Sequence, residues 1–200
     1  MVKKISIGIT GIQGAISEHV FSMKITLQKA NIPGEIIIIK NPNQIDEVDG
    51  LVIPGGESTT ISKILYQSGI YNAILRRLNE NNLPIMGTCA GCILLASELV
   101  DNSKEVKLLS AIDMKVKRNA FGRQRESFEH NIQIKDFSEP FNAVFIRAPI
   151  IENVWGGCKI LAKIDKKIVM VKQNNLLALS FHPELTDDFR IHNYFLNMLV

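Results

Sequence analysis

The sequence predicts an α/β fold in which helices cover both faces of a mostly parallel β-sheet. Strand-like and helix-like patterns alternate over the first hundred residues, as in such sheets. Shorter β-like runs dominate the second half and predict an antiparallel extension. With 200 residues, 46% of them hydrophobic, the chain can bury one substantial core, so we expect a single domain over residues 1–200.

Strands and helices are predicted in turn along the first half. The strands cover residues 5–10, 35–40, 51–54 and 83–87, and the helices cover about 17–30 and, with breaks, the stretch after the 55–60 turn to about 81. Because residues 35–40 include four consecutive isoleucines, we expect a central strand that is buried on both faces. A helical pattern also covers residues 92–100, after the fourth strand.

The second half contains shorter β-like runs and one helix. The runs cover residues 115–117, 128–134, 143–147, 160–164, 167–172 and 176–181. We expect antiparallel strands or extensions of the sheet here. The helix covers residues 187–199, with Thr186 or Asp187 as its N-cap.

Composition and charge argue against several classes of protein. The formal net charge is +3, but the 23 basic and 20 acidic residues are interspersed, without the Lys/Arg cluster typical of nucleic-acid binding. The N-terminal apolar stretch is too short for a signal peptide, and no stretch reaches the length of a membrane span. The three cysteines provide neither a disulfide framework nor a zinc-site spacing. We expect a cytoplasmic protein with no metal, nucleic-acid or membrane partner.

Residues 87–91, GTCAG, lie between the fourth predicted strand and a helical pattern. This is where a nucleophile elbow would expose Cys89, with glycines that let the backbone bend sharply. A buried structural cysteine is the alternative. We interpret Cys92 and Cys158 as packing residues, although Cys89 and Cys92 also have the spacing of a redox pair.

His182-Pro183-Glu184 follows the apolar run 176–181. Proline disfavours a helical conformation at the preceding residue, so we expect an extended segment in which His182 and Glu184 point to the same side. A cysteine nucleophile needs a base, and the base needs an acceptor that orients it. Cys89, His182 and Glu184 are therefore the predicted catalytic triad, and the other three histidines (His19, His130, His192) are interpreted as structural or surface residues.

An oxyanion hole would complete this site with hydrogen-bond donors. The backbone N–H of Ala90, next to the nucleophile, is one candidate. The Gly55-Gly56 turn after the third strand offers another, which we assign to Gly56, although a diglycine can equally be an ordinary turn.

Six segments, spread over nearly the whole chain, carry a family resemblance. They are QGA (13–15), PGGESTT (54–60), GTCAG (87–91), RNAFGRQ (118–124), FIRAP (145–149) and HPELT (182–186). In this order they resemble the glutaminase subunit of pyridoxal 5'-phosphate synthase, a class I triad glutamine amidotransferase. The triad motifs alone indicate the superfamily, whereas PGGEST, RNAFGRQ and FIRAP are typical of this one family.

The resemblance implies a three-layer α/β/α, flavodoxin-like fold and hydrolysis of L-glutamine to glutamate and ammonia without a cofactor. Cys89 would attack the side-chain amide, His182 would carry a proton to the ammonia, and Glu184 would orient His182. The glutamine-binding positions implied are Gly56, Glu57, Ser58, Arg118, Ile146 and Arg147. Arginine suits this role because its fork can grip a carboxylate at two points, although both arginines could be ordinary surface cations.

The resemblance also implies a partner. A barrel-shaped synthase subunit would activate the glutaminase and receive its ammonia to build pyridoxal phosphate, in a complex of twelve plus twelve subunits. The loop around Gln13 is expected to change conformation on docking.

Three alternatives remain open at this stage. Another triad amidotransferase would feed a different acceptor subunit. A cysteine peptidase on a similar scaffold would not need Arg118 and Arg147 to hold a free amino acid. A regulatory module that has lost the chemistry is disfavoured because all three triad residues are present.

Overall fold

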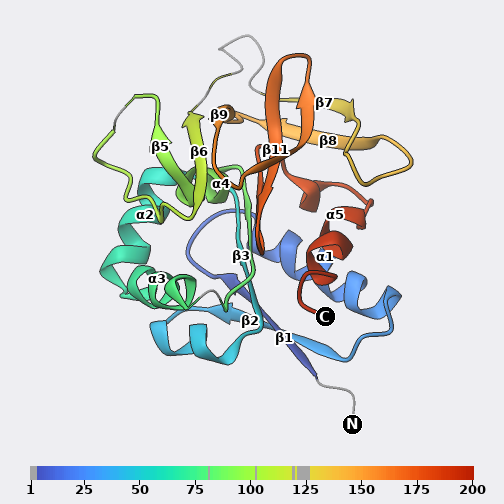
Figure 1. The fold of residues 1–200 in the computed structure, drawn as a ribbon. Coiled ribbons are helices and arrows are strands. Elements are labelled where there is room, and N and C mark those ends of the chain that lie inside the picture. Colours follow the sequence, from blue (N-terminus) through green and yellow to red (C-terminus); the bar gives the residue numbers. More distant parts are fainter. Residues whose placement is uncertain (1–3, 81, 102, 119, 121–126) are drawn as a thin grey trace.

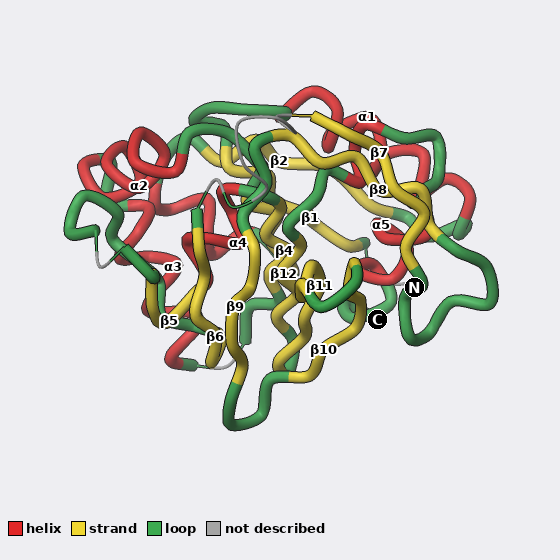
Figure 2. Tube along the Cα trace, turned by 90° about the horizontal axis from the view of Figure 1, so that it is seen from above, coloured by secondary structure: helices red, strands yellow, loops and turns green. Residues whose placement is uncertain are grey.

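The computed structural model describes residues 4–80, 82–101, 103–118, 120 and 127–200. Helices lie on both faces of a large central sheet, which gives three layers (Figures 1 and 2). Helices α2 (Ser58–Gln67) and α3 (Ile70–Asn79) cover one face, and α1 (Ile16–Lys29) and α5 (Arg190–Leu196) cover the other. None of the helices in the described part of the chain is long and apolar enough to cross a membrane.

The remaining elements complete the sheet and its connections. They are β1 (Ile5–Thr10), β2 (Gly34–Ile39), β3 (Gly50–Ile53), β4 (Ile85–Thr88), β5 (Ala96–Leu99), β6 (Ile112–Lys117), β7 (Ser127–Ile132), β8 (Phe141–Ile146), β9 (Ile150–Val154), β10 (Lys159–Ile164), β11 (Lys167–Gln173), β12 (Leu176–Leu179), the short helix α4 (Ala90–Leu95) and the 3-10 segments η1 (Pro42–Glu47) and η2 (Pro183–Leu185).

The sheet has a parallel half and a mostly antiparallel half. Its order is β2-β1-β3-β4-β12-β11-β9-β6-β5, with β10 paired to β11, while β7 and β8 form a separate hairpin. The strands from β2 to β12 pair in parallel, whereas β11 runs antiparallel to β12, β10 and β9. A mostly parallel sheet with an antiparallel extension is therefore confirmed.

Pairing of β12 with β4 positions the candidate site. Leu179, the last residue of β12, lies beside Thr88, the last residue of β4. Since the two strands are parallel, the segments that follow them leave the sheet at the same edge, where open α/β sheets bind ligands. This brings His182 to the neighbourhood of Cys89 across more than ninety positions of sequence.

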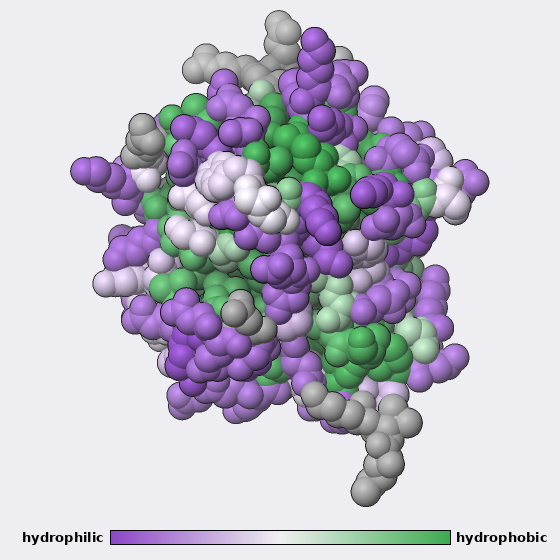
Figure 3. Space-filling view, viewed as in Figure 1, coloured by the Kyte–Doolittle hydropathy of each residue, from purple (hydrophilic) through white to green (hydrophobic). Residues whose placement is uncertain are grey.

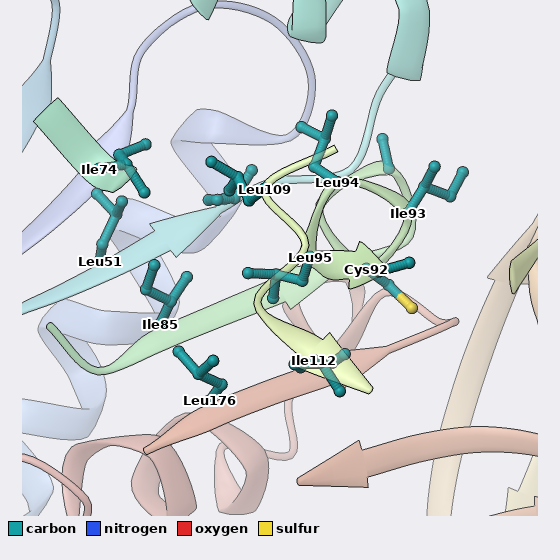
Figure 4. Packing of buried hydrophobic residues seen from close by; sticks show 14 of the residues in the cluster. Leu51, Ile74, Ile85, Cys92, Ile93, Leu94, Leu95, Leu109, Ile112 and Leu176 are labelled. Atoms are coloured by element: carbon teal, nitrogen blue, oxygen red, sulfur yellow. The ribbon is translucent and has the colours of Figure 1, made fainter. Parts of the chain in front are cut away.

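Apolar side chains alternate between two hydrophobic clusters, one on each face of the sheet. In β3, Leu51 and Ile53 belong to the cluster beneath α2, α3 and α4, whereas Val52 belongs to the cluster beneath α1 and α5. Figure 4 shows the first cluster, in which Leu51, Ile85 and other aliphatic side chains pack together. Cys92 lies in this cluster and is fully buried, as expected for a packing residue.

Two predictions about single elements were wrong. The isoleucine-rich segment is β2, an edge strand that pairs with β1, and Ile38 is 40% exposed. The helical pattern of residues 92–100 contains the end of α4 and then β5, because Ala96 is extended and Ser97 Oγ donates a hydrogen bond to the carbonyl of Ile112 in β6. Pairing with β6 thus overrides the helical pattern.

The C-terminal helix begins later than predicted, and β9 was not predicted at all. Helix α5 starts at Arg190, with Phe189 at the N-cap and no side-chain cap. Thr186 Oγ1 instead bonds to the carbonyl of Pro183 and accepts from the N–H of Asp188, so this side chain stabilises the turn before the helix. Neither predicted cap residue therefore begins the helix.

Candidate active site

Cys89 lies at the corner between β4 and α4. Its φ of 48° and ψ of −98° are rare for a residue with a side chain, so the backbone is strained at this point. The N–H of Cys89 donates to the carbonyl of Leu179 in β12 at 2.8 Å, which holds the corner against the neighbouring strand. The structure thus places Cys89 at a strand-to-helix corner, the position that the GTCAG pattern predicts.

Gly91 allows the corner to lie close to the adjacent strand. A Cβ at this position would overlap the carbonyl oxygen of Ile53 in β3. Only glycine therefore fits without a shift of backbone. The same close approach brings the corner beside the Gly55-Gly56 turn, which follows β3.

His182 and Glu184 are both buried and form a short hydrogen bond. Nδ1 of His182 donates to Oε1 of Glu184 at 2.7 Å. The prediction of an extended segment was wrong, because Pro183 begins the 3-10 segment η2. The turn nevertheless brings both side chains to the same side, as predicted. The backbone N–H of His182 donates to the carbonyl of Val144 in β8, which fixes the start of this turn.

Hydrogen bonding dominates the electrostatics of this pair. Burial lowers the pKa of His182, but hydrogen bonds to Cys89 and Glu184 outweigh it and raise the pKa to about 10. Burial also raises the pKa of Glu184, yet the nearby His19 and the hydrogen bond from His182 together lower it below its ordinary value. The ionised carboxylate therefore lies behind an imidazole whose raised pKa makes it a strong acceptor for the proton of the Cys89 thiol.

Cys89 and His182 line a cavity of about 380 Å³. The other lining residues are Gly56, Glu57, Ser58, Ile93, Arg118, Ile146 and Arg147. All six residues that the sequence predicts for glutamine binding are thus brought together around the thiol. Ile93 was not predicted, although its place one helical turn after the nucleophile was a usable signal.

Glu57 begins α2 as its N-cap. Its carboxylate accepts hydrogen bonds from the N–H groups of Thr59 at 3.1 Å and Thr60 at 2.6 Å. Its pKa is lowered: burial raises it, but these hydrogen bonds outweigh that effect. The N–H of Glu57 donates to Oε1 of Gln13 at 3.3 Å, so the predicted docking loop contacts the rim of the cavity.

The two arginines of the cavity differ in setting. Arg118 donates from Nε and Nη2 to one carboxylate oxygen of Asp101, at 2.9 and 2.7 Å. Arg147 has a φ of 45° and follows Ile146, whose carbonyl accepts from the Cys89 thiol at 3.8 Å. Apart from Arg118 and Ala120, the RNAFGRQ motif lies outside the described residues.

The predicted oxyanion donors, Ala90 and Gly56, both belong to the surroundings of Cys89. Ala90 is the first residue of α4, and N–H groups in a first helical turn have no intrahelical acceptor. Gly56 lines the cavity, whereas the N–H of Gly55 is already used by Oγ1 of Thr88 at 3.0 Å. The oxyanion role of Ala90 and Gly56 stays a prediction.

Sequence reasoning missed the position of His19. Its side chain is fully buried on α1, with Nε2 3.3 Å from Oε2 of Glu184 and Nδ1 3.2 Å from Nε2 of His192. Nothing in the sequence around residue 19 pointed to a contact with residue 184. His130, by contrast, is exposed on β7.

The setting of Cys92 does not favour a redox pair with Cys89, and Cys158 is not a reactive thiol either. Cys92 is buried in the core, and this burial raises the pKa of its thiol well above the ordinary range. Burial likewise raises the pKa of Cys158 to about 11. Among the described residues, no three His, Cys, Asp or Glu side chains are grouped to hold a metal ion.

Known proteins resemble this chain over nearly its full length. The model of the SNO glutamine amidotransferase family matches residues 9–200. A pyridoxal 5'-phosphate synthase subunit PdxT from Pyrococcus horikoshii is 46% identical, covering 97% of this chain and 99% of the relative, and one from Methanococcoides burtonii is 48% identical, covering 96% and 98%.

Solved structures of glutamine amidotransferases have the same fold as this chain. A glutamine amidotransferase crystal structure, 38% identical, has a TM-score of 0.86 and covers 96% of this chain and 98% of its own. A glutamine amidotransferase from Thermotoga maritima shares the fold at 13% identity, with a TM-score of 0.64 and coverage of 98% and 94%. The chain therefore belongs to the SNO glutamine amidotransferase family.

Proposed function

We propose that this protein is the glutaminase subunit of a pyridoxal 5'-phosphate synthase. It hydrolyses L-glutamine to L-glutamate and ammonia, and the ammonia passes to a synthase subunit. The observation that carries the proposal is the cavity that gathers the Cys89 thiol, His182 and two arginines, with Glu184 behind the imidazole. The curated relatives are named as subunits of this synthase, which supports the acceptor.

The reaction follows from the positions of the side chains. His182 takes the thiol proton as Cys89 adds to the amide carbon of glutamine, and the resulting oxyanion is held by the N–H groups of Ala90 and Gly56. His182 then gives its proton to the departing nitrogen, the C–N bond breaks and ammonia leaves, and the glutamyl group remains bound to Cys89 as a thioester. Water, deprotonated by His182, releases glutamate and restores the thiol. Glu184 stabilises the imidazolium throughout.

Substrate binding uses the remaining residues of the cavity. Arg118 and Arg147 attract the α-carboxylate of glutamine, and the Glu57 carboxylate balances its α-ammonium group. A volume of about 380 Å³ suits a free amino acid and lies at the small end of ligand cavities. Gly56, Ser58 and Ile146 shape the rest of the cavity.

The partner completes the proposal. A barrel-shaped synthase subunit docks on this glutaminase in a complex of twelve plus twelve subunits, in the cytoplasm, and residues 1–200 act as a single glutaminase domain. Docking changes the conformation of the loop around Gln13, whose side chain contacts the N–H of Glu57 at the cavity rim. Activity therefore depends on the synthase.

Ammonia release from glutamine tests the proposal, measured with and without the synthase subunit. We expect a low rate from the free chain and a strong increase when the synthase is added. Equal rates in both conditions would contradict activation by the partner. No release even with the synthase would overturn the assignment.

Cys89→Ala tests the nucleophile. We expect glutamine turnover to vanish while co-purification with the synthase persists, because the change removes only the reacting sulfur. A glutamine analogue that alkylates thiols should label the unchanged chain at Cys89 and leave the variant unlabelled. Residual turnover by the variant would show that another group attacks the amide.

A further inference from the structure

The second oxygen of the triad carboxylate faces a buried histidine on another element. Oε1 of Glu184 accepts from His182, and Oε2 lies 3.3 Å from Nε2 of His19. Both side chains are fully shielded from solvent. Among the described residues Oε2 has no hydrogen bond of ordinary geometry, and Nε2 of His19 is a polar group that offsets its burial.

The carboxylate also favours one tautomer of the neutral His19 ring. Burial lowers the pKa of His19, which favours the neutral imidazole, although the nearby Glu184 raises that pKa. A neutral imidazole carries one hydrogen on its two ring nitrogens. Because Nε2 of His19 faces the ionised Glu184 oxygen, the tautomer with this hydrogen on Nε2 is favoured. Nδ1 then accepts from Nε2 of His192, 3.2 Å away.

His19 also contacts the residue that precedes the nucleophile. Its Nε2 lies 3.1 Å from Oγ1 of Thr88, and that hydroxyl accepts the N–H of Gly55. One imidazole thus lies against both the end of β4, which carries Cys89, and the carboxylate that orients His182.

We propose that His19 is a positioning residue for the glutaminase reaction. It holds Glu184 and Thr88 at a fixed separation, and so sets the His182 ring relative to the Cys89 sulfur. The inference rests on the proposed function for its substrate, but its geometry concerns the thiol and imidazole alone. A buried histidine that only fills space in the core is the competing explanation.

His19→Gln and His19→Asn separate these explanations, because the two amides differ in reach. A Gln amide can occupy the place of Nε2, whereas an Asn amide reaches only as far as Nδ1. With the synthase present, we expect His19→Asn to lower kcat for glutamine about 10-fold or more at unchanged KM. His19→Gln should stay within about 3-fold of the unchanged enzyme.

A double-mutant cycle with Glu184→Gln tests whether His19 acts through the carboxylate. In that background His19→Asn should cost less than about 2-fold, because the charge that His19 holds is gone. Thr26→Val, a buried polar-to-apolar change on the same helix, is the control and should leave kcat unchanged. The proposal would be overturned if His19→Asn lowered kcat by the same factor with and without Glu184→Gln. It would also be overturned if His19→Asn and His19→Gln lowered kcat equally.

Alkylation of Cys89 by iodoacetamide gives a readout that does not depend on glutamine. Measured on the free chain by mass spectrometry of the Cys89 peptide, it should slow in His19→Asn and recover in His19→Gln. This pattern without any ammonia release would uphold the role of His19 and reject the glutaminase assignment. Normal glutaminase activity and normal alkylation in His19→Asn would reject the role of His19 alone.

Discussion

At the scale of single residues, Gly55 shows how tightly the triad is enclosed. A Cβ at this position would overlap Cε1 of His182 and lie 3.1 Å from Cβ of Cys89. Both catalytic side chains thus pack against a backbone without a side chain. The His182 ring is thus held by packing against the Gly55 backbone and by its hydrogen bond to Glu184.

Gly55→Ala should therefore abolish glutaminase activity. The added methyl group must displace the imidazole or the strand end, which we expect to lower kcat more than about 100-fold and to destabilise the fold by about 1–3 kcal/mol. Ammonia release with the synthase and a urea unfolding curve measure the two effects. Gly157→Ala is the control, since the nearest atom to its Cβ is 3.9 Å away, and near-normal activity in Gly55→Ala would show that the ring has room to move.

The residues of the site were predictable to different degrees for a physical reason. Motifs that follow strands of the parallel half, such as those containing Glu57, Cys89 and His182, could be assigned because strand ends gather at one edge of a parallel sheet. His19 could not, since its contact with Glu184 depends on how α1 packs beneath the sheet edge. Local sequence carries no signal for such packing.

At the scale of elements, prediction succeeded where local pattern and pairing agree. Helices α2 and α3, separated at Gly69, match the interrupted helix expected before residue 81. The pattern failed at β2, because a run of isoleucines cannot distinguish a central strand from an edge strand with Ile38 partly exposed. It failed again after α4, where pairing with β6 decides the conformation.

Helix α2 connects a capping interaction to the substrate cavity. Because the Glu57 carboxylate bonds to the N–H groups of Thr59 and Thr60, Glu57→Ala should destabilise the protein by about 1 kcal/mol. It should also raise KM for glutamine, since Glu57 lines the cavity. For Glu57→Ala, the urea concentration at the midpoint of unfolding should fall while the slope of the free energy with urea stays the same. Glu57→Asp, which keeps a capping carboxylate, should restore the midpoint. An unchanged midpoint in Glu57→Ala would show that the cap contributes nothing.

At the scale of the whole molecule, the site combines segments that are far apart in the sequence. Cys89 follows β4, His182 follows β12, and His19 comes from α1 in the layer below. Charged and polar side chains cover most of the face in Figure 3, with apolar groups in separate patches between them. Ile146 is an exposed large apolar residue that lines the cavity, so the exposure of its side chain belongs to the site.

The buried histidines make the stability of the whole fold sensitive to acid. Burial lowers the pKa of His192 well below 6.5 and also lowers that of His19, whereas unfolded histidines titrate near 6.5. The unfolded state therefore binds more protons below pH 6.5, and the free energy of unfolding falls as the pH drops from there toward the lowered pKa values. His182 has a raised pKa, so its stabilisation is fully present below pH 6.5 and is lost only as the pH rises toward about 10.

Unfolding by urea between about pH 7 and about pH 5 measures this effect. Each histidine buried in its neutral form steepens the loss by up to about 1.4 kcal/mol per pH unit. His192→Leu removes one titrating group and should flatten the profile, although its midpoint at neutral pH can differ. His130→Leu, a change at an exposed position of β7, should keep the original slope. A slope that is the same in His192→Leu and the unchanged chain would mean that His192 is protonated in the folded protein.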